Sequence, residues 1–161
     1  MKLADGKDPS QITGLTDKTV MELIAETGLD LQKNWKTEKH FVSWSCLSPT
    51  KHQSGKSNKR RFKKGKTKVG QIFREAAQSI ANTKYSALGG FYRRIKAKKG
   101  GLVANKATAR KIAVLFYNVM TKGADYVEEG LISYQRKFKE QQIQRLQKQA
   151  KYLGLQLVPA Q

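Results

Sequence analysis

The chain has 161 residues, of which 32 are Lys or Arg and 12 are Asp or Glu, so its formal net charge is +20. This length suits one domain with an extension, and so large a basic excess indicates anionic partners. The longest apolar run, residues 112–117, is far shorter than a membrane span of about 18 residues, and the first ten residues contain no apolar signal region. A single cysteine excludes an intramolecular disulfide, so we expect a cytoplasmic protein rather than a transporter or a secreted scaffold.

The first ten residues are polar and predict a flexible leader, residues 1–10. A turn around Gly14 then leads to a helix, for which Thr16 is a suitable N-cap and Gly28 a suitable end. An apolar stripe indicates the buried face of this helix: Val20, Leu23, Ile24 and Thr27. The turn has two interpretations, which the sequence leaves open. It is either a plain turn with a cap or the hairpin of a helix-hairpin-helix module, whose backbone N–H groups would hold a phosphate.

A second short helix is predicted to start at Thr37, to direct Phe41, Trp44 and Leu47 inward and to end before Pro49. The composition changes between residues 50 and 68, where Gly, Ser, Asn and Lys dominate. This segment is predicted to be a basic loop or a short hairpin that an anionic ligand orders.

Three helices are predicted next, each from its apolar spacing. Their inward-facing residues are Val69, Ile72, Phe73, Ala76, Ala77 and Ile80 in the first, Leu88, Phe91, Tyr92 and Ile95 in the second, and Ala109, Ile112, Phe116 and Val119 in the third, which is expected over residues 104–120. Gly100 and Gly101 are predicted to end the second helix, and Gly123 the third.

Residues 127–153 predict one long polar helix, which is either a lone extension or covered by a partner helix. The gap of five between Phe138 and Ile143 breaks a heptad register, so a regular coiled coil is not expected. The fold class is therefore mainly α, a compact multi-helix domain with a basic loop and a long C-terminal helix. We expect a leader at 1–10, a helical domain at 11–123 that contains the loop 50–68, and a helical extension at 124–161.

The positive charge is concentrated in residues 39–124, which hold 21 basic residues and one acid, Glu75. A helix face stabilised by salt bridges would mix the signs, and a membrane-surface helix would oppose its cations to a broad apolar face. We therefore expect a surface that binds polyanions such as nucleic acids, the alternative being a basic tail or charge that serves solubility. The candidate contact residues lie in two clusters: Lys51, Lys56, Lys59, Arg60, Arg61, Lys63, Lys64, Lys66 and Lys68 in the first, and Arg93, Arg94, Lys96, Lys98 and Lys99 in the second, which continues to Lys111.

Few residues suggest catalysis. Gly55-Lys56-Ser57 resembles the end of a P-loop, but Thr50 stands where that loop needs a glycine. No cluster of Asp, Glu or Cys accompanies His40 and His52, so we expect no metal and no cofactor in this chain. Ser54 lies inside the basic loop before Gly55. It is either an ordinary phosphate contact or a nucleophile for a DNA phosphate, because neighbouring cations stabilise both the alkoxide and the transferring group.

Six segments, taken in order, resemble the carboxy-terminal domain of the IS-one-ten/IS-one-eleven-eleven insertion-sequence transposases, also called bridge-RNA-guided recombinases. The segments are QITGLTDKTVMELIAETGLD, WKTEKHFVSWSCLSP, QSGK at 53–56, VGQIFREAAQSI, LGGFYRRIKAKKGG and ATARKIAVLFYNVM. The similarity runs from Gln11 to Lys122. In that family the domain is helical and carries a serine nucleophile in a Ser-Gly-(Gly)-Lys motif.

The resemblance implies that Ser54 attacks a DNA phosphate and that Gly55 and Lys56 belong to the same motif. The backbone of Gly14, in the hairpin interpretation of its turn, and the backbone of Gly55, which allows a ligand to approach closely, are the candidate backbone contacts to phosphate. Full-length members begin with a RuvC-like domain whose four acids bind magnesium, so we expect a truncated transposase that is inactive alone. The implied partners are DNA, guide RNA and either a second copy or a full-length transposase, in the nucleoid and not at a membrane. Two other hypotheses are a non-catalytic nucleic-acid-binding protein and an interaction module that uses the helix at 127–153.

Overall fold

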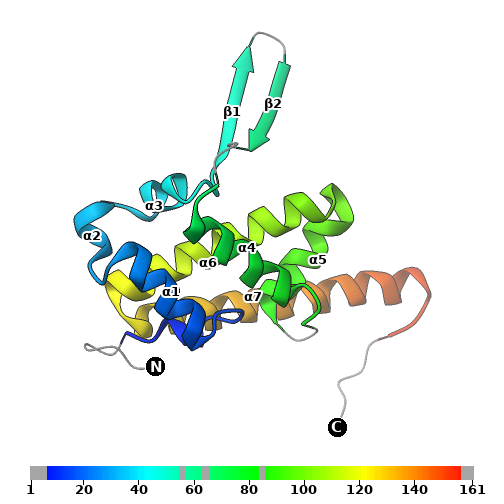
Figure 1. Ribbon diagram of the computed structural model, residues 1–161. Coiled ribbons are helices and arrows are strands. Elements are labelled where there is room, and N and C mark those ends of the chain that lie inside the picture. The colour runs from blue at the N-terminus through cyan, green and yellow to red at the C-terminus, as the bar shows by residue number, and fades with distance from the viewer. Residues whose placement is uncertain (1–6, 55–56, 63–65, 84–85, 157–161) are drawn as a thin grey trace. The chain divides into compact units, whose positions relative to one another are not determined.

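The computed structural model describes residues 7–54, 57–62, 66–83 and 86–156 (Figure 1). The chain divides into two compact units, residues 1–127 and 128–161. The fold is mainly helical, as predicted, with one antiparallel hairpin inserted between two helices. The elements are a 3-10 helix at Pro9–Gln11, α1 at Asp17–Thr27, α2 at Leu31–Asn34, α3 at Glu38–Trp44, β1 at Pro49–Ser54, β2 at Ser57–Phe62, α4 at Lys68–Ile80, α5 at Ala87–Lys99, α6 at Gly101–Lys122 and α7 at Ala124–Tyr152.

Helix α1 begins and ends where its sequence predicts. The Thr16 side chain accepts a hydrogen bond from the Thr19 N–H at 3.3 Å, and the Thr19 side chain accepts one from the Thr16 N–H at 2.8 Å. These two bonds form a capping box, which satisfies two backbone donors at the helix start. Gly28 ends the helix, and its N–H donates to the Ile24 carbonyl.

The turn before α1 packs against α4. Gly14 has φ +95°, and a Cβ at this position would lie 2.5 Å from Cδ1 of Ile80 and 2.9 Å from the carbonyl oxygen of Ala76. Both the backbone conformation and the close approach therefore require glycine. Ile12 and Leu15, on either side, are buried. The turn thus has a packing function of its own.

The core of the first unit surrounds α6, which contacts α2, α3, α4 and α5. All four residues predicted to face inward from α6 are buried, and so are all six predicted for α4. In α5 the predicted face is only partly confirmed, because Leu88 and Tyr92 are buried while Phe91 and Ile95 are half-buried.

Three phenylalanines from three helices meet at the centre of this core. The ring centroids of Phe41, Phe73 and Phe116 lie 5.7 to 6.2 Å apart, which are favourable separations for aromatic pairs. Trp44 was predicted to face inward with Phe41, and this prediction is wrong in part: its side chain is 39% exposed. It covers the edge of the core, where its ring lies 4.6 Å from that of Trp35.

The start of α6 and the presence of α2 differ from the predictions. Helix α6 begins at Gly101, three residues earlier than expected, because Gly100 alone ends α5 and its carbonyl already accepts the first α6 hydrogen bond, from the Ala104 N–H. Helix α2 was not predicted. It has only one turn and one buried residue, Leu31, so no apolar period marks it, and the signal that remains is its N-cap Asp30, which accepts from the Lys33 N–H.

The long C-terminal helix is present as α7. Ile143 and Leu146 are 44% and 53% exposed, in agreement with a polar helix, whereas Ala150 is buried. The other predicted stripe, Leu131 to Phe138, lies among side chains outside the described residues. Among the described helices, none has the length and apolarity needed to cross a membrane.

Helix α6 is also tied to the segment before α3. The Tyr117 hydroxyl donates a 2.6 Å hydrogen bond to the Trp35 carbonyl, 82 residues away in the sequence. Burial raises the pKa of Tyr117 above its usual value of 10.0, and the charge of Glu38 raises it further. The unfolded chain therefore releases this proton at a lower pH than the folded chain.

Replacing Tyr117 with phenylalanine is expected to lower the free energy of unfolding by about 1–2 kcal/mol, because the carbonyl of Trp35 loses its hydrogen-bond donor. The difference in free energy of unfolding between the two proteins should be constant below about pH 10 and should shrink above it. Only the wild type has a phenol that ionises at a lower pH in the unfolded chain than in the folded chain, which favours unfolding at high pH. Urea unfolding of both proteins between pH 7 and pH 11 measures this. A difference that grows above pH 10 would contradict the assignment.

Candidate nucleic-acid interface

Helix α5 presents the second basic cluster. Its N-cap is Ser86, whose side chain accepts from the Gly89 N–H, and its last two turns carry the predicted residues. All five are exposed: Arg93, Arg94, Lys96, Lys98 and Lys99. Three of these lysines lie in the last turn, where the helix dipole favours cations. The charge is therefore both accessible and compatible with helix stability.

Arg93 also has a structural role, which the charge pattern does not reveal. Its Nη1 donates to the carbonyl of Thr83 at 2.7 Å and to that of Ala81 at 3.4 Å. These carbonyls lie at the end of α4, so Arg93 ties α5 to α4. A guanidinium has five N–H donors, so these bonds leave donors for a phosphate.

Phe91 brings together cations from α5 and α6. The Lys111 ammonium lies 4.3 Å from the ring centroid and the Arg94 guanidinium carbon lies 5.7 Å from it. Both distances are within the range of cation–π attraction. The Phe91 ring therefore lies close to one cation from α5 and one from α6, the two helices that carry the second basic cluster.

A further pair of cations lies between α4 and α6. Burial lowers the pKa of Lys106, and the positive charge of Arg74 lowers it further. The Arg74 guanidinium donates to Oε1 of Gln71 at 2.8 Å. The backbone carbonyl of Arg74 accepts a hydrogen bond from Nδ2 of Asn105 at 3.0 Å. Sequence reasoning missed Arg74, because it lies outside both clusters and its proximity to Lys106 depends on how α4 and α6 pack.

The first cluster lies largely on the β-hairpin. Residues in β1 and β2 pair from Pro49 with Phe62 to Ser54 with Ser57, so Ser54 is the last residue of its strand. This confirms the hairpin interpretation of the basic segment. Lys51 pairs with Arg60, and Lys59 and Arg61 pair with His52 and Thr50. The predicted residues Gly55, Lys56, Lys63 and Lys64 lie outside the described residues.

Two predicted contact residues lie where the hairpin joins α4. Lys66 and Lys68 are both exposed. The Lys68 ammonium forms a 2.8 Å ion pair with Glu26 of α1, and this hydrogen bond raises the pKa of Lys68. Lys68 is thus partly neutralised by an acid that lies 42 residues away in the sequence.

The residues that the structure describes do not form a metal site: no three His, Cys, Asp or Glu side chains among them lie close enough together to hold an ion. His40, on α3, is exposed.

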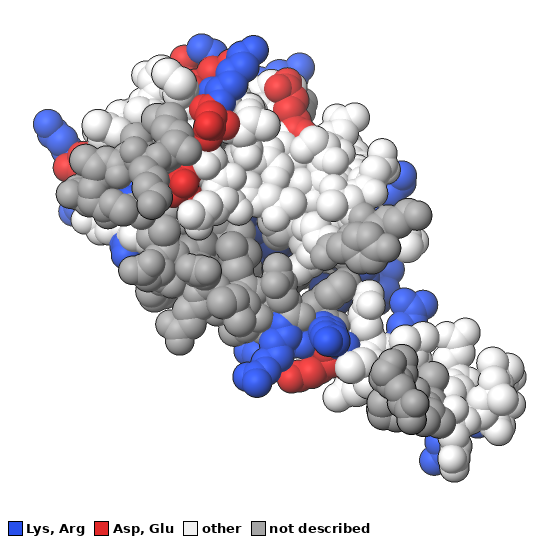
Figure 2. Space-filling view, turned by 90° about the horizontal axis from the view of Figure 1, so that it is seen from below, with Lys and Arg blue, Asp and Glu red and all other residues white. Residues whose placement is uncertain are grey.

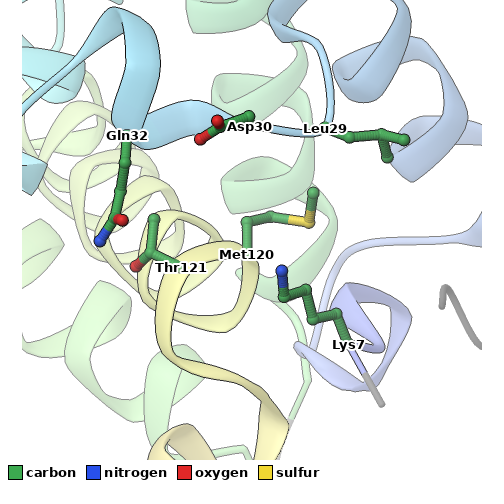
Figure 3. A pocket seen from close by; sticks show the side chains of 6 residues that line it. All are labelled: Lys7, Leu29, Asp30, Gln32, Met120 and Thr121. Atoms are coloured by element: carbon green, nitrogen blue, oxygen red, sulfur yellow. The ribbon is translucent and has the colours of Figure 1, made fainter. Parts of the chain in front are cut away.

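A shallow hollow of about 220 Å³ lies apart from these cations, between the α1–α2 connection and the end of α6 (Figure 3). Its lining residues are Lys7, Leu29, Asp30, Gln32, Met120 and Thr121. The lining contains one lysine and one carboxylate among neutral side chains, which do not form a group of residues suited to catalysis. Figure 2 shows a face on which acidic and basic side chains occur together among large uncharged areas, so the positive charge does not cover the whole surface.

The fold and the cations together define a helical domain with a basic hairpin and a second basic surface on α5 and α6. This α5–α6 surface consists of the exposed residues Arg93, Arg94, Lys96, Lys98, Lys99 and Arg110. A family model described as Transposase IS116/IS110/IS902 family matches residues 10–93, slightly more than half of the chain. The chain therefore belongs to this transposase family, and family membership indicates DNA as its partner. No curated protein matches the chain, and no solved structure does.

Proposed function

We propose that this chain is the serine-bearing DNA-acting domain of an insertion-sequence transposase, and that Ser54 is its nucleophile. The observation that carries the proposal is the position of Ser54. It ends β1 in a hairpin that lies within the residues matched by the transposase model. Between residues 39 and 74 the sequence has no acid to oppose the approach of DNA.

The reaction is a phosphoryl transfer. Oγ of Ser54 attacks a DNA phosphorus, the new Ser–O–P bond forms as the bond to a sugar oxygen breaks, and the serine proton ends on that sugar oxygen. One phosphodiester is exchanged for another, so no external energy source is needed. Positive side chains near the phosphate stabilise the charge that develops on the transferring group.

The cations of the hairpin and of the α5–α6 surface would bind the DNA backbone, and guide RNA offers the same phosphates. Phosphate contacts position a nucleic acid without reading its sequence, so target choice would come from the guide. The backbones of Gly14 and Gly55 would add further contacts to phosphates. The magnesium-binding acids would come from a RuvC-like domain of a partner transposase.

The test is capture of a covalent adduct. The chain is incubated with donor and target DNA, guide RNA and a full-length family member that lacks its own serine, and adducts are separated on a denaturing gel. Wild type should give a protein–DNA adduct and Ser54→Ala should give none. Ser57→Ala, which removes the hydroxyl of the paired residue opposite Ser54, is the matched control and should react like wild type.

A non-catalytic nucleic-acid-binding protein is the second candidate, favoured by the lack of a metal site among the described residues. It predicts DNA binding equal to wild type for Ser54→Ala and no adduct from any variant. An adduct that persists in Ser54→Ala would exclude both this candidate and the assignment of Ser54.

A further inference from the structure

A hydrogen bond joins the two helices between which the hairpin is inserted. Oγ1 of Thr67 donates to the carbonyl of Ser45 at 3.2 Å, across 22 residues of sequence. Ser45 is the C-cap of α3 and Thr67 is the N-cap of α4. The bond therefore joins the end of α3 to the start of α4, the two helices that flank the hairpin in the sequence.

The Thr67 hydroxyl has two functions at once. It accepts a 3.0 Å hydrogen bond from the Gly70 N–H, as an N-cap does, and it uses its own proton for the Ser45 carbonyl. A hydroxyl can accept and donate, whereas a carboxylate can only accept. A substitution at Thr67 can therefore keep the cap of α4 and remove the hydrogen bond to the Ser45 carbonyl.

Gly70 lets the two ends approach this closely. A Cβ at Gly70 would lie directly against the Ser45 carbonyl oxygen and 2.9 Å from Oγ1 of Thr67. Glycine is unfavourable inside a helix, so its presence in the first turn of α4 is explained by this close contact.

The chain on the α3 side of the junction is fixed as well. Cys46 has φ +57°, its N–H donates to the Ser43 carbonyl, and the Leu47 N–H donates to the Val42 carbonyl. This is a Schellman motif with cysteine in the position that usually holds glycine. Leu47 is buried, so one residue, Ser48, separates a fixed anchor from the start of β1.

From this geometry we infer that Thr67 is a positioning residue, which through the Ser45 carbonyl fixes the direction in which the hairpin carries Ser54. The inference rests on the proposed function of Ser54. A strand of six residues is about 20 Å long, so a tilt of about 10° at its base moves its end by about 3–4 Å. Misplacement of a reacting group by about 1 Å can cost a hundredfold in rate, so the junction governs the chemistry.

The test compares Thr67→Asp, which keeps the cap and removes the donor, with Thr67→Ser, which keeps both. Thr37→Asp is the matched control, because Thr37 caps α3 by accepting from the His40 N–H and its substitution adds the same charge. Spin labels on cysteines placed at Asn58 and at the exposed Gln78, in a Cys46→Ala background, report the distance between hairpin and core.

Thr67→Asp should at least double the width of the distance distribution, whereas Thr67→Ser and Thr37→Asp should leave it unchanged. In the adduct assay, Thr67→Asp should slow adduct formation at least tenfold while its DNA affinity stays equal to that of Thr37→Asp. Unchanged width for Thr67→Asp, or equal broadening by Thr37→Asp, overturns the inference, and so does an adduct rate equal to that of the control. If wild type forms no adduct, the proposed function fails, and the distance distributions still decide whether Thr67 fixes the hairpin.

Discussion

Replacing Phe41 with alanine is expected to lower the free energy of unfolding by about 3–5 kcal/mol, a large share of the roughly 5–15 kcal/mol that stabilises a domain. The Phe41 side chain has no solvent exposure and its ring contacts those of Phe73 and Phe116. Its removal leaves a cavity where α3, α4 and α6 meet. Because α3 and α4 carry the two ends of the hairpin, nucleic-acid binding should weaken together with stability.

Trp44→Ala is the control for this prediction, since Trp44 is a larger aromatic residue of the same helix but is 39% exposed. Its loss should cost clearly less than that of Phe41. Urea unfolding followed by circular dichroism measures both. If Trp44→Ala destabilised the protein as much as Phe41→Ala, the core would not be centred on the three phenylalanines.

Neutralising the exposed cations of the α5–α6 surface is expected to weaken DNA binding at least tenfold at moderate salt. Each lost phosphate contact should reduce the slope of log K against log salt by about 0.9, so five lost contacts would reduce it by up to about 4.5. The variant replaces five exposed residues with glutamine: Arg94, Lys96, Lys98, Lys99 and Arg110.

The matched control removes the same charge from α7. It replaces five exposed residues of that helix with glutamine: Arg136, Lys137, Lys139, Arg145 and Lys148. If charge alone governed binding, the two variants would lose equal affinity and equal slope. We expect the α7 variant to retain most of the wild-type slope, and equal losses would contradict a localised interface.

Helix positions were predictable from the sequence where an apolar period and a cap coincide. In α4 the apolar stripe marks the buried face, and α1 begins at the N-cap that the sequence predicts, Thr16. The hairpin was predictable only as one of two possibilities, because its strands have no apolar alternation. Helix α2 was not predictable, since one buried leucine in one turn gives no period.

The candidate site was predictable as a charge distribution but not as an arrangement. Composition identifies the basic clusters, whereas the proximity of Arg74 to Lys106 and the ion pair of Lys68 with Glu26 depend on how α1, α4 and α6 pack. The junction of Ser45 with Thr67 likewise joins residues that no local pattern connects. Tertiary contacts of this kind give no signal in a single sequence.

The central claim, that Ser54 attacks DNA from the hairpin, is tested most directly by locating the covalent bond. The adduct formed in the complementation assay is digested with nuclease and protease, and the modified peptide is sequenced by mass spectrometry. We predict a phosphonucleotide remnant on Ser54 in the peptide that contains β1. A remnant on any other residue of this chain, or on the partner transposase alone, would contradict the claim.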